Sequence, residues 1–423
     1  MHPFTLIFLV ALAAHVMVQL WLARRQIMFV EANMGVVPSG FATAVTLVEH
    51  SKAAAYTVAR QRFGMLEAIV DALLLLWLTL GGGIARIGSV ASALIGSPLL
   101  AGTLHVLGVF AALALLSLPF NAYRTFVLEQ KFGFNRTRPA VFAADQVKAW
   151  ALGLLLGGAM VACVLWIMAS TGTSWWLVGW AVWLAFMLLI TWAWPRIFAP
   201  LFNKFSPLED QALRQRIDAL LERCNFHAKS IFVMDGSRRS SHGNAYFTGL
   251  GREKRIVFFD TLLSSLTPAQ VESVLAHELA HFRLRHVPQR LVAGALMSLA
   301  GFALLGWLAR QAWFYGALGV PSGTDAAALV LFILVTPVFS WVVSPLLAAW
   351  SRRHEYQADA FAATHSDPQA LAEALVKLYK DNASTLTPDP IYSAFHDSHP
   401  PPAARIERLN AFLSSKAPAA AAP

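Results

Sequence analysis

The sequence predicts a mainly α-helical protein that crosses a membrane several times and carries a small α/β segment on one side of the bilayer. Of the 423 residues, 57% are hydrophobic and 13% are charged, whereas a soluble domain carries about 25% charged residues. With a mean hydropathy of +0.54, this composition excludes an ordinary soluble enzyme and a disordered or fibrous chain. Two cysteines are too few for a disulfide scaffold or a cysteine-rich metal domain.

Seven apolar segments are long enough to cross the hydrocarbon core as helices, which takes about 20 residues. The first is expected to be a retained helix and not a secretory signal, because its basic pair Arg24–Arg25 follows the apolar run instead of preceding it. The seven segments are Pro3–Leu22, Phe63–Leu80, Leu100–Pro119, Trp150–Ser170, Trp175–Trp194, Leu291–Phe314 and Ala326–Trp350.

The basic residues predict the orientation of these helices. If the N-terminus lies outside, the inside segments are 23–62, 120–149, 195–290 and 350–423, and they hold every Lys and Arg except Arg86 and Arg310. The positive-inside rule therefore predicts an external N-terminus and a cytoplasmic C-terminus. The formal net charge is +9, and the charged residues flank apolar segments. This distribution indicates a lipid bilayer as partner and not nucleic acid.

The longest polar stretch, 195–290, has the pattern of a small α/β unit. It begins with a helical pattern over Leu208–Cys224. Three β-rich runs follow, separated by Gly- and Ser-rich connections typical of a small meander: Ser230–Met234, Asn244–Thr248 and Arg255–Asp260. Thr267 and Gln270 then form a capping-box pattern with Pro268 between them, which predicts the start of another helix.

That helix carries His277-Glu278-Leu279-Ala280-His281, an HExxH motif. Residues four apart lie on one helix face, so both imidazoles can bind one metal ion. Glu278 can accept a proton from a water molecule whose pKa zinc lowers to about 7. The motif therefore predicts one Zn²⁺ per chain and hydrolytic chemistry.

A catalytic zinc site needs a third protein ligand and an open position. After the last apolar segment, Glu355 and Asp359 are also four residues apart and share a helix face. One carboxylate can bind zinc while the other accepts the free N–H of a zinc-binding histidine. His354 is the competing candidate, but Ala358 lies at the same spacing from it, so we expect Glu355 to be the ligand.

Several further blocks accompany the two motifs along nearly the whole chain. In order, the blocks are Glu129 with Phe132–Asn135, Ile197–Phe205, Ser240–Phe247, Lys254–Leu263, the HExxH helix, Glu355–Phe361, and Ser398–Pro401 with Arg405. In these blocks and their order the sequence resembles the type I CAAX prenyl proteases, a family of seven-helix membrane zinc endoproteases that trim prenylated C-termini.

The resemblance implies that seven helices enclose a chamber with the zinc site near the cytoplasmic side. It assigns zinc to His277, His281 and Glu355, makes Glu278 the general base, and gives Asp359 the task of orienting a histidine. Asn244, on an expected edge strand, would bind the backbone of an extended substrate. His399 and Arg405 would stabilise the oxyanion or bind a substrate carboxylate.

We accordingly divide the chain into five segments. The first five membrane helices occupy 1–194, the α/β segment with HExxH occupies 195–290, and the last two membrane helices occupy 291–350. The segment 351–415 carries the third zinc ligand with His399 and Arg405, and 416–423 is expected to be disordered. Lacking an evident retention signal and rich in Ala and Arg, the chain fits a bacterial inner membrane better than the endoplasmic reticulum.

The leading hypothesis is a membrane zinc endopeptidase that cleaves near the C-terminus of a prenylated or otherwise hydrophobic peptide. A membrane quality-control zinc protease of broad specificity is the nearest alternative. Site-2-type proteases are disfavoured because their HExxH lies inside a membrane helix, whereas this one carries Glu272, Arg283 and Arg285. A non-catalytic receptor or transporter with structural zinc would need a fourth protein ligand, and none stands out.

Overall fold

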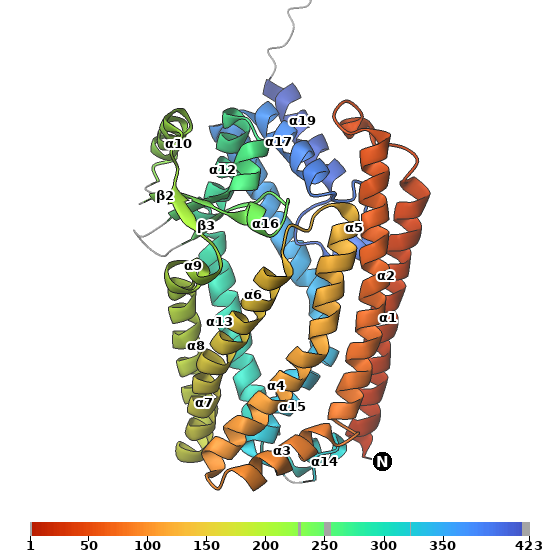
Figure 1. Ribbon diagram of the computed structural model, residues 1–423, viewed down its shortest axis with the longest axis vertical. Helices are drawn as coiled ribbons and strands as arrows, with labels where there is room; N and C mark the ends of the chain where they lie inside the picture. Colours follow the sequence, from red (N-terminus) through yellow and green to blue (C-terminus); the bar gives the residue numbers. More distant parts are fainter. Residues whose placement is uncertain (1, 227–229, 249–254, 322, 417–423) are drawn as a thin grey trace, which may run out of the picture.

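The computed structural model describes residues 2–226, 230–248, 255–321 and 323–416. Helices make up most of this part of the chain, and a small sheet lies at one end (Figure 1). The first helix starts at the opposite end, beside α3 (Gly83–Leu94) and α14 (Ala312–Ala317). The predicted fold class, mainly helical with a small α/β part, is confirmed.

Within the described residues, six helical stretches are long and apolar enough to cross a membrane. A seventh results if α2 (Leu47–Leu78) and α3, which meet at a 54° bend, form one span. The six are α1 (Pro3–Asn33); α4 (Pro98–Tyr123) with α5 (Gln130–Phe132); α6 (Pro139–Leu152) with α7 (Gly158–Ser170); α8 (Trp175–Ala193) with α9 (Ala199–Phe202); α13 (His286–Leu308); and α15 (Asp325–Ser340) with α16 (Ser344–His365). The chain is therefore a multi-pass membrane protein, and each predicted segment overlaps one of these spans.

The spans pack through a continuous apolar core while leaving apolar side chains on their outer surface. Phe8 of α1, Val106 of α4, Leu305 of α13 and Val330 of α15 belong to this core. Large apolar side chains on other faces are exposed, among them Leu115, Leu155, Leu189, Leu296 and Leu346. Such a surface is stable only when lipid covers it.

The polar end has a second core, built like that of a soluble domain. Leu220 of α10 (Gln211–Arg223), Leu275 of α12 (Pro268–Arg283) and Leu371 of α17 (Pro368–Asp381) are buried in it together with the sheet. The remaining helices of this end are α11 (Asp260–Ser265), α18 (Pro390–His396) and α19 (Pro402–Lys416). The expected capping box of Thr267 and Gln270 is present at α12. The helix predicted over Leu208–Cys224 is α10, which begins three residues later, at Gln211, with Asp210 as its cap.

The sheet has four strands in the described chain: β1 (Phe205–Pro207), β2 (Ser230–Met234), β3 (Ala245–Thr248) and β4 (Arg255–Phe259). Their order is β1-β2-β4-β3, and β2 runs parallel to β4, with Ile231 opposite Ile256. The predicted meander is therefore wrong. The apolar run of β4 is buried at Ile256, Val257 and Phe258, so it needs a neighbour on each side and occupies the centre.

The predicted edge position of the second β-rich run is correct. β3 pairs antiparallel with β4 and has no other partner strand among the described residues. Strand β1 could not be predicted, because three residues that include Pro207 are too few for an alternating pattern.

Candidate metal centre

The HExxH residues lie in the second half of α12, as predicted, and they face α16. The two helices pack against each other, and both carry small buried side chains. Ala276 and Ala280 of α12 and Ala358 and Ala362 of α16 are fully buried. This packing brings the histidines of one helix against the carboxylates of the other.

His277, His281 and Glu355 form a group whose ligand atoms all lie within 4.8 Å of one another. The Glu355 carboxylate lies between the imidazoles, 3.3 Å from Nε2 of His277 and 3.5 Å from Nε2 of His281. A tetrahedral zinc ion with ligand distances of about 2.0–2.2 Å separates its ligand atoms by about 3.3–3.6 Å. The donor set and its spacing therefore fit a zinc ion with three protein ligands.

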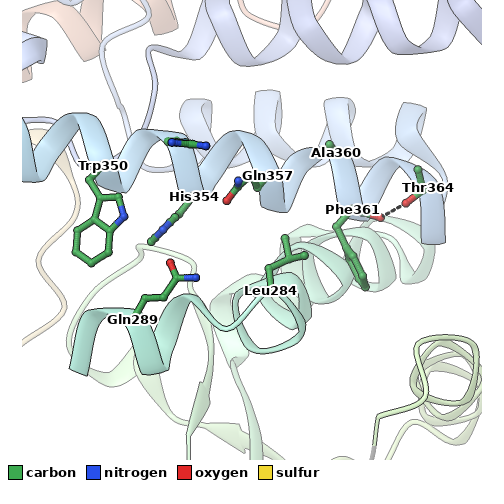
Figure 2. Close-up of a pocket in the computed structure, with 9 residues that line it drawn as sticks. Leu284, Gln289, Trp350, His354, Gln357, Ala360, Phe361 and Thr364 are labelled. Atoms are coloured by element: carbon green, nitrogen blue, oxygen red, sulfur yellow. Dashed lines mark hydrogen bonds between the residues drawn. The ribbon is translucent and has the colours of Figure 1, made fainter. Parts of the chain in front are cut away.

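His354 points away from this group. Its ring stacks on His286 at a centroid distance of 4.0 Å and an angle of 4°, and Trp350 contacts it edge-on. Figure 2 shows His354 and Trp350 on the pocket side of α16, opposite Gln289 of α13. Neighbouring helix positions point about 100° apart, so the orientation that turns Glu355 toward the histidines turns His354 away.

Asp359 lies one turn beyond Glu355, next to His277. Its Oδ1 is 2.9 Å from Nδ1 of His277, although the contact is angled away from ideal hydrogen-bond geometry. Arg405 of α19 donates from Nε and Nη2 to both oxygens of Asp359, at 2.8 and 2.6 Å. Asp359 is thus held between a metal-binding histidine and a buried guanidinium.

Without a bound cation, the surrounding charges and burial shift the pKa values of His277 and His281 in opposite directions. Burial by itself lowers the pKa of His277, but contacts with Asp359 and Glu355 outweigh it and raise the value to about 9. Burial and the positive charge of His277 lower the pKa of His281 to about 3. Because metal ligands must be unprotonated, cation binding displaces a proton from His277.

Glu278 follows His277 on α12 and lies within electrostatic range of the group. Burial raises its pKa, the positive charge of His277 opposes that rise, and the charge of Glu355 adds to it. A carboxylate with a raised pKa is a stronger base when ionised, which suits proton transfer near neutral pH.

His399 contacts the metal-binding group, and Asn244 lies at the start of the edge strand β3. The exposed ring of His399 places Nδ1 2.7 Å from Oε2 of Glu355. Asn244 directly precedes β3; its Oδ1 accepts from the Ala245 N–H at 2.8 Å, and its side chain is exposed. Phe247 of β3 packs on Phe282 of α12 at 5.4 Å, which fixes the edge strand beside the HExxH helix.

Three further residues adjoin this group. His286 contacts His281, Gln357 contacts His286, and the Tyr379 hydroxyl is 3.5 Å from Nη1 of Arg405. Of these, only His286 carries a sequence signal, as the one residue of 284–287 with a side chain suited to a metal site. The turn that brings it back to His281 depends on Arg285, which has φ 59° and which no sequence signal marks.

Two family models match this chain. One, described as peptidase family M48, matches residues 207–413, which include α12 and α16. The other, described as the N-terminal region of CAAX prenyl proteases with five membrane helices, matches residues 26–204. The chain belongs to the CAAX prenyl protease 1 family of M48 metallopeptidases.

Relatives and a solved structure agree with this membership. The chain is 36% identical over 305 residues to the CAAX prenyl protease 1 homolog of Arabidopsis thaliana, covering 72% of this chain and 71% of that one. It is 36% identical over 334 residues to CAAX prenyl protease 1 of Saccharomyces cerevisiae, covering 75% and 73%. The crystal structure of S. mikatae Ste24p matches with a TM-score of 0.89 at 30% identity, covering 97% of this chain and 100% of that one. The CAAX prenyl protease family resemblance predicted from the sequence is confirmed, as is a membrane metallopeptidase with a His277, His281 and Glu355 site.

Proposed function

We propose that this CAAX prenyl protease-like peptidase binds one zinc ion through His277, His281 and Glu355 and hydrolyses a peptide bond near the C-terminus of prenylated or otherwise hydrophobic peptides. The observation that carries the proposal is that one ligand atom from each of the three residues lies within 4.8 Å of the others. Oε2 of Glu355 is 3.3 Å from Nε2 of His277, and its Oε1 is 3.5 Å from Nε2 of His281. Such a set leaves a fourth position free, as hydrolytic zinc sites require.

Glu278 is the general base of the proposed reaction. When bound, zinc supplies an electrophile that acidifies water and polarises a carbonyl group. Glu278 takes the proton of the attacking water and returns it to the leaving amine, a task supported by its raised pKa. His399, exposed and in contact with Glu355, is available to donate to the developing oxyanion.

Arg405 is a positioning residue in this proposal. The family resemblance implied that it contacts the oxyanion or a substrate carboxylate, but two of its nitrogens donate to Asp359 and it is only 5% exposed. It holds Asp359, which in turn orients His277. Metal-binding histidines commonly depend on such a carboxylate partner.

The substrate binds in an extended conformation along β3. This strand offers unpaired backbone groups at the edge of the described sheet and packs beside α12. Peptides often add to such an edge as another strand, with main-chain hydrogen bonds fixing their register. The amide of Asn244, at the start of the edge, donates to the substrate backbone.

The metal centre faces the cytoplasm, and the N-terminus lies outside. The distribution of Lys and Arg supports this orientation, and α1 begins at the end of the molecule opposite the sheet. The composition supports a bacterial inner membrane as the compartment. The matched relatives described above are eukaryotic, so fractionation of the native host is the direct test of this compartment.

A peptide-selection assay tests the proposed substrate class. The purified chain is incubated with a farnesylated CAAX peptide, the same peptide without the lipid, and an unfolded membrane protein, each beside Glu278→Gln as the inactive control. We expect the lipidated peptide to be cut fastest, near its C-terminus. Cleavage of the unfolded protein alone would replace this function by broad quality-control proteolysis.

A further inference from the structure

A second hydrogen-bonded chain leads away from His281, on the side of the ring opposite the metal-binding nitrogen. Nδ1 of His281 is 3.0 Å from Nδ1 of His286, and Nε2 of His286 is 2.9 Å from Oε1 of Gln357. The chain therefore links α12, α13 and α16. His277, by contrast, has the Asp359 carboxylate in the corresponding place.

Once His281 binds metal through Nε2, a single arrangement of protons satisfies both hydrogen bonds. A neutral His281 that binds metal through Nε2 carries its proton on Nδ1 and donates it to His286. Nδ1 of His286 must then be unprotonated, so its proton lies on Nε2. The carbonyl oxygen Oε1 of Gln357 accepts that proton's hydrogen bond. An amide oxygen can only accept, so Oε1 of Gln357 matches the tautomer of His286 that accepts from a metal-bound His281.

The surrounding structure holds His286 in this position. Arg285 has a left-handed backbone conformation, φ 59°, which ends α12 and turns the chain into α13. His286 is 1% exposed, and its ring lies flat on His354, which Trp350 contacts in turn. Figure 2 shows His354 and Gln357 on α16, beside a cavity of about 670 Å³.

We infer that His286 is a positioning residue that fixes the tautomer of His281 for metal binding, with Gln357 as the acceptor that fixes the tautomer of His286. The two metal-binding histidines are thus oriented by different means, one by a carboxylate and one by a neutral imidazole. Loss of such a partner typically lowers metal affinity or activity about 10–100-fold. The inference rests on the proposed role of His281 as a metal ligand.

The test measures Zn²⁺ affinity of the purified full-length chain by competition with a chromophoric chelator, together with the melting temperature of the metal-free protein. His286→Phe keeps a ring that can stack on His354 but has no nitrogen. We expect its zinc affinity to fall about 10–100-fold with little change in melting temperature. His354→Phe, the matched control, changes the other ring of the same stack and should keep wild-type affinity.

Two variants of Gln357, the last residue of this hydrogen-bonded series, test the direction of the hydrogen bonds. Gln357→Glu retains an acceptor oxygen and should bind zinc like the wild type, whereas Gln357→Met removes the acceptor and should bind more weakly. These variants also serve if His286→Phe fails to fold. Gln357 is exposed enough to tolerate both changes.

The outcomes separate this inference from the proposed metal site. Wild-type affinity in His286→Phe, or equal losses in His286→Phe and His354→Phe, would overturn the positioning role. If His281→Ala also kept wild-type zinc affinity, the metal site itself would be wrongly assigned. If His281→Ala lost zinc while His286→Phe did not, the site would stand and only the inference would fall.

Discussion

Arg405 and Asp359 form a buried, two-pronged ion pair directly behind a metal-binding histidine. The guanidinium donates at 2.8 and 2.6 Å to the two carboxylate oxygens, and the residues are 5% and 3% exposed. Because Asp359 also lies 2.9 Å from His277, the C-terminal helix α19 is linked through α16 to α12. Arg405 is thus joined to the metal-binding group through Asp359.

This pair predicts that stability and metal binding can be separated. Arg405→Met leaves Asp359 buried without its cation and should destabilise the fold by about 3–5 kcal/mol, seen as a lower melting temperature. Combining Arg405→Met with Asp359→Leu removes both charges, so stability should largely return while zinc affinity stays low. Full recovery of zinc affinity in the double variant would show that Asp359 does not orient His277.

Glu278→Gln separates metal binding from proton transfer. The amide has nearly the size of the carboxyl group and leaves all three ligands intact, so zinc content should remain near one per chain. Turnover should fall about 10²–10⁴-fold, the usual contribution of a general acid–base group. Peptide cleavage at a near-normal rate would refute the proposed mechanism.

Glu355 and His354 are neighbours on α16, yet only one lies with the histidines. Glu355→Ala should lose most bound zinc and all cleavage, because two neutral imidazoles alone make a weak site. His354→Ala should retain about one zinc per chain. Metal analysis of both purified variants decides between them, and zinc loss in His354→Ala alone would contradict the ligand assignment.

Topology can be tested with single cysteines. In a background in which Cys163 and Cys224 are replaced by Ser, Pro321→Cys lies on the predicted outside and Glu209→Cys on the predicted inside. A membrane-impermeant thiol reagent added to intact cells should label position 321, and should label position 209 only after the membrane is opened. The reverse pattern would invert the orientation.

Asn244 can bind substrate or simply shape the turn before β3. Asn244→Ala should raise KM about 2–12-fold, the equivalent of one hydrogen bond of about 0.5–1.5 kcal/mol, with kcat little changed. Asn244→Asp keeps the oxygen that accepts from Ala245 but loses the amide donor, so it should show the same KM defect. A normal KM in Asn244→Asp would assign the residue to the turn alone.

Local patterns were sufficient to predict the elements that bear the site. The HExxH spacing and the Thr267–Gln270 capping box both depend on residues within one or two helical turns, and both are present in α12. The pair Glu355 and Asp359 follows the same rule on α16. The membrane spans were equally readable, since about 20 apolar residues in a row have few alternatives to a transmembrane helix.

Contacts between elements that lie far apart in the sequence could not be predicted. The order of the strands departs from the meander because burial of Ile256, Val257 and Phe258 puts β4 in the centre, next to β2. Likewise, the family resemblance implied that Arg405 contacts the oxyanion or a substrate carboxylate, and only the packing of α19 on α16 reveals its ion pair with Asp359. Such contacts depend on how separate elements meet.

The sequence by itself determined that this is a multi-pass membrane metallopeptidase, because hydropathy and the i, i+4 ligand spacing are local properties of single helices. Tertiary structure alone decided what lies behind each ligand. His277 is backed by Asp359 and His281 by His286, which reaches it through the left-handed turn at Arg285. The physical reason is that a hydrogen bond between two helices depends on their relative position and on the backbone dihedral of the turn between them. Neither can be predicted from a local sequence pattern.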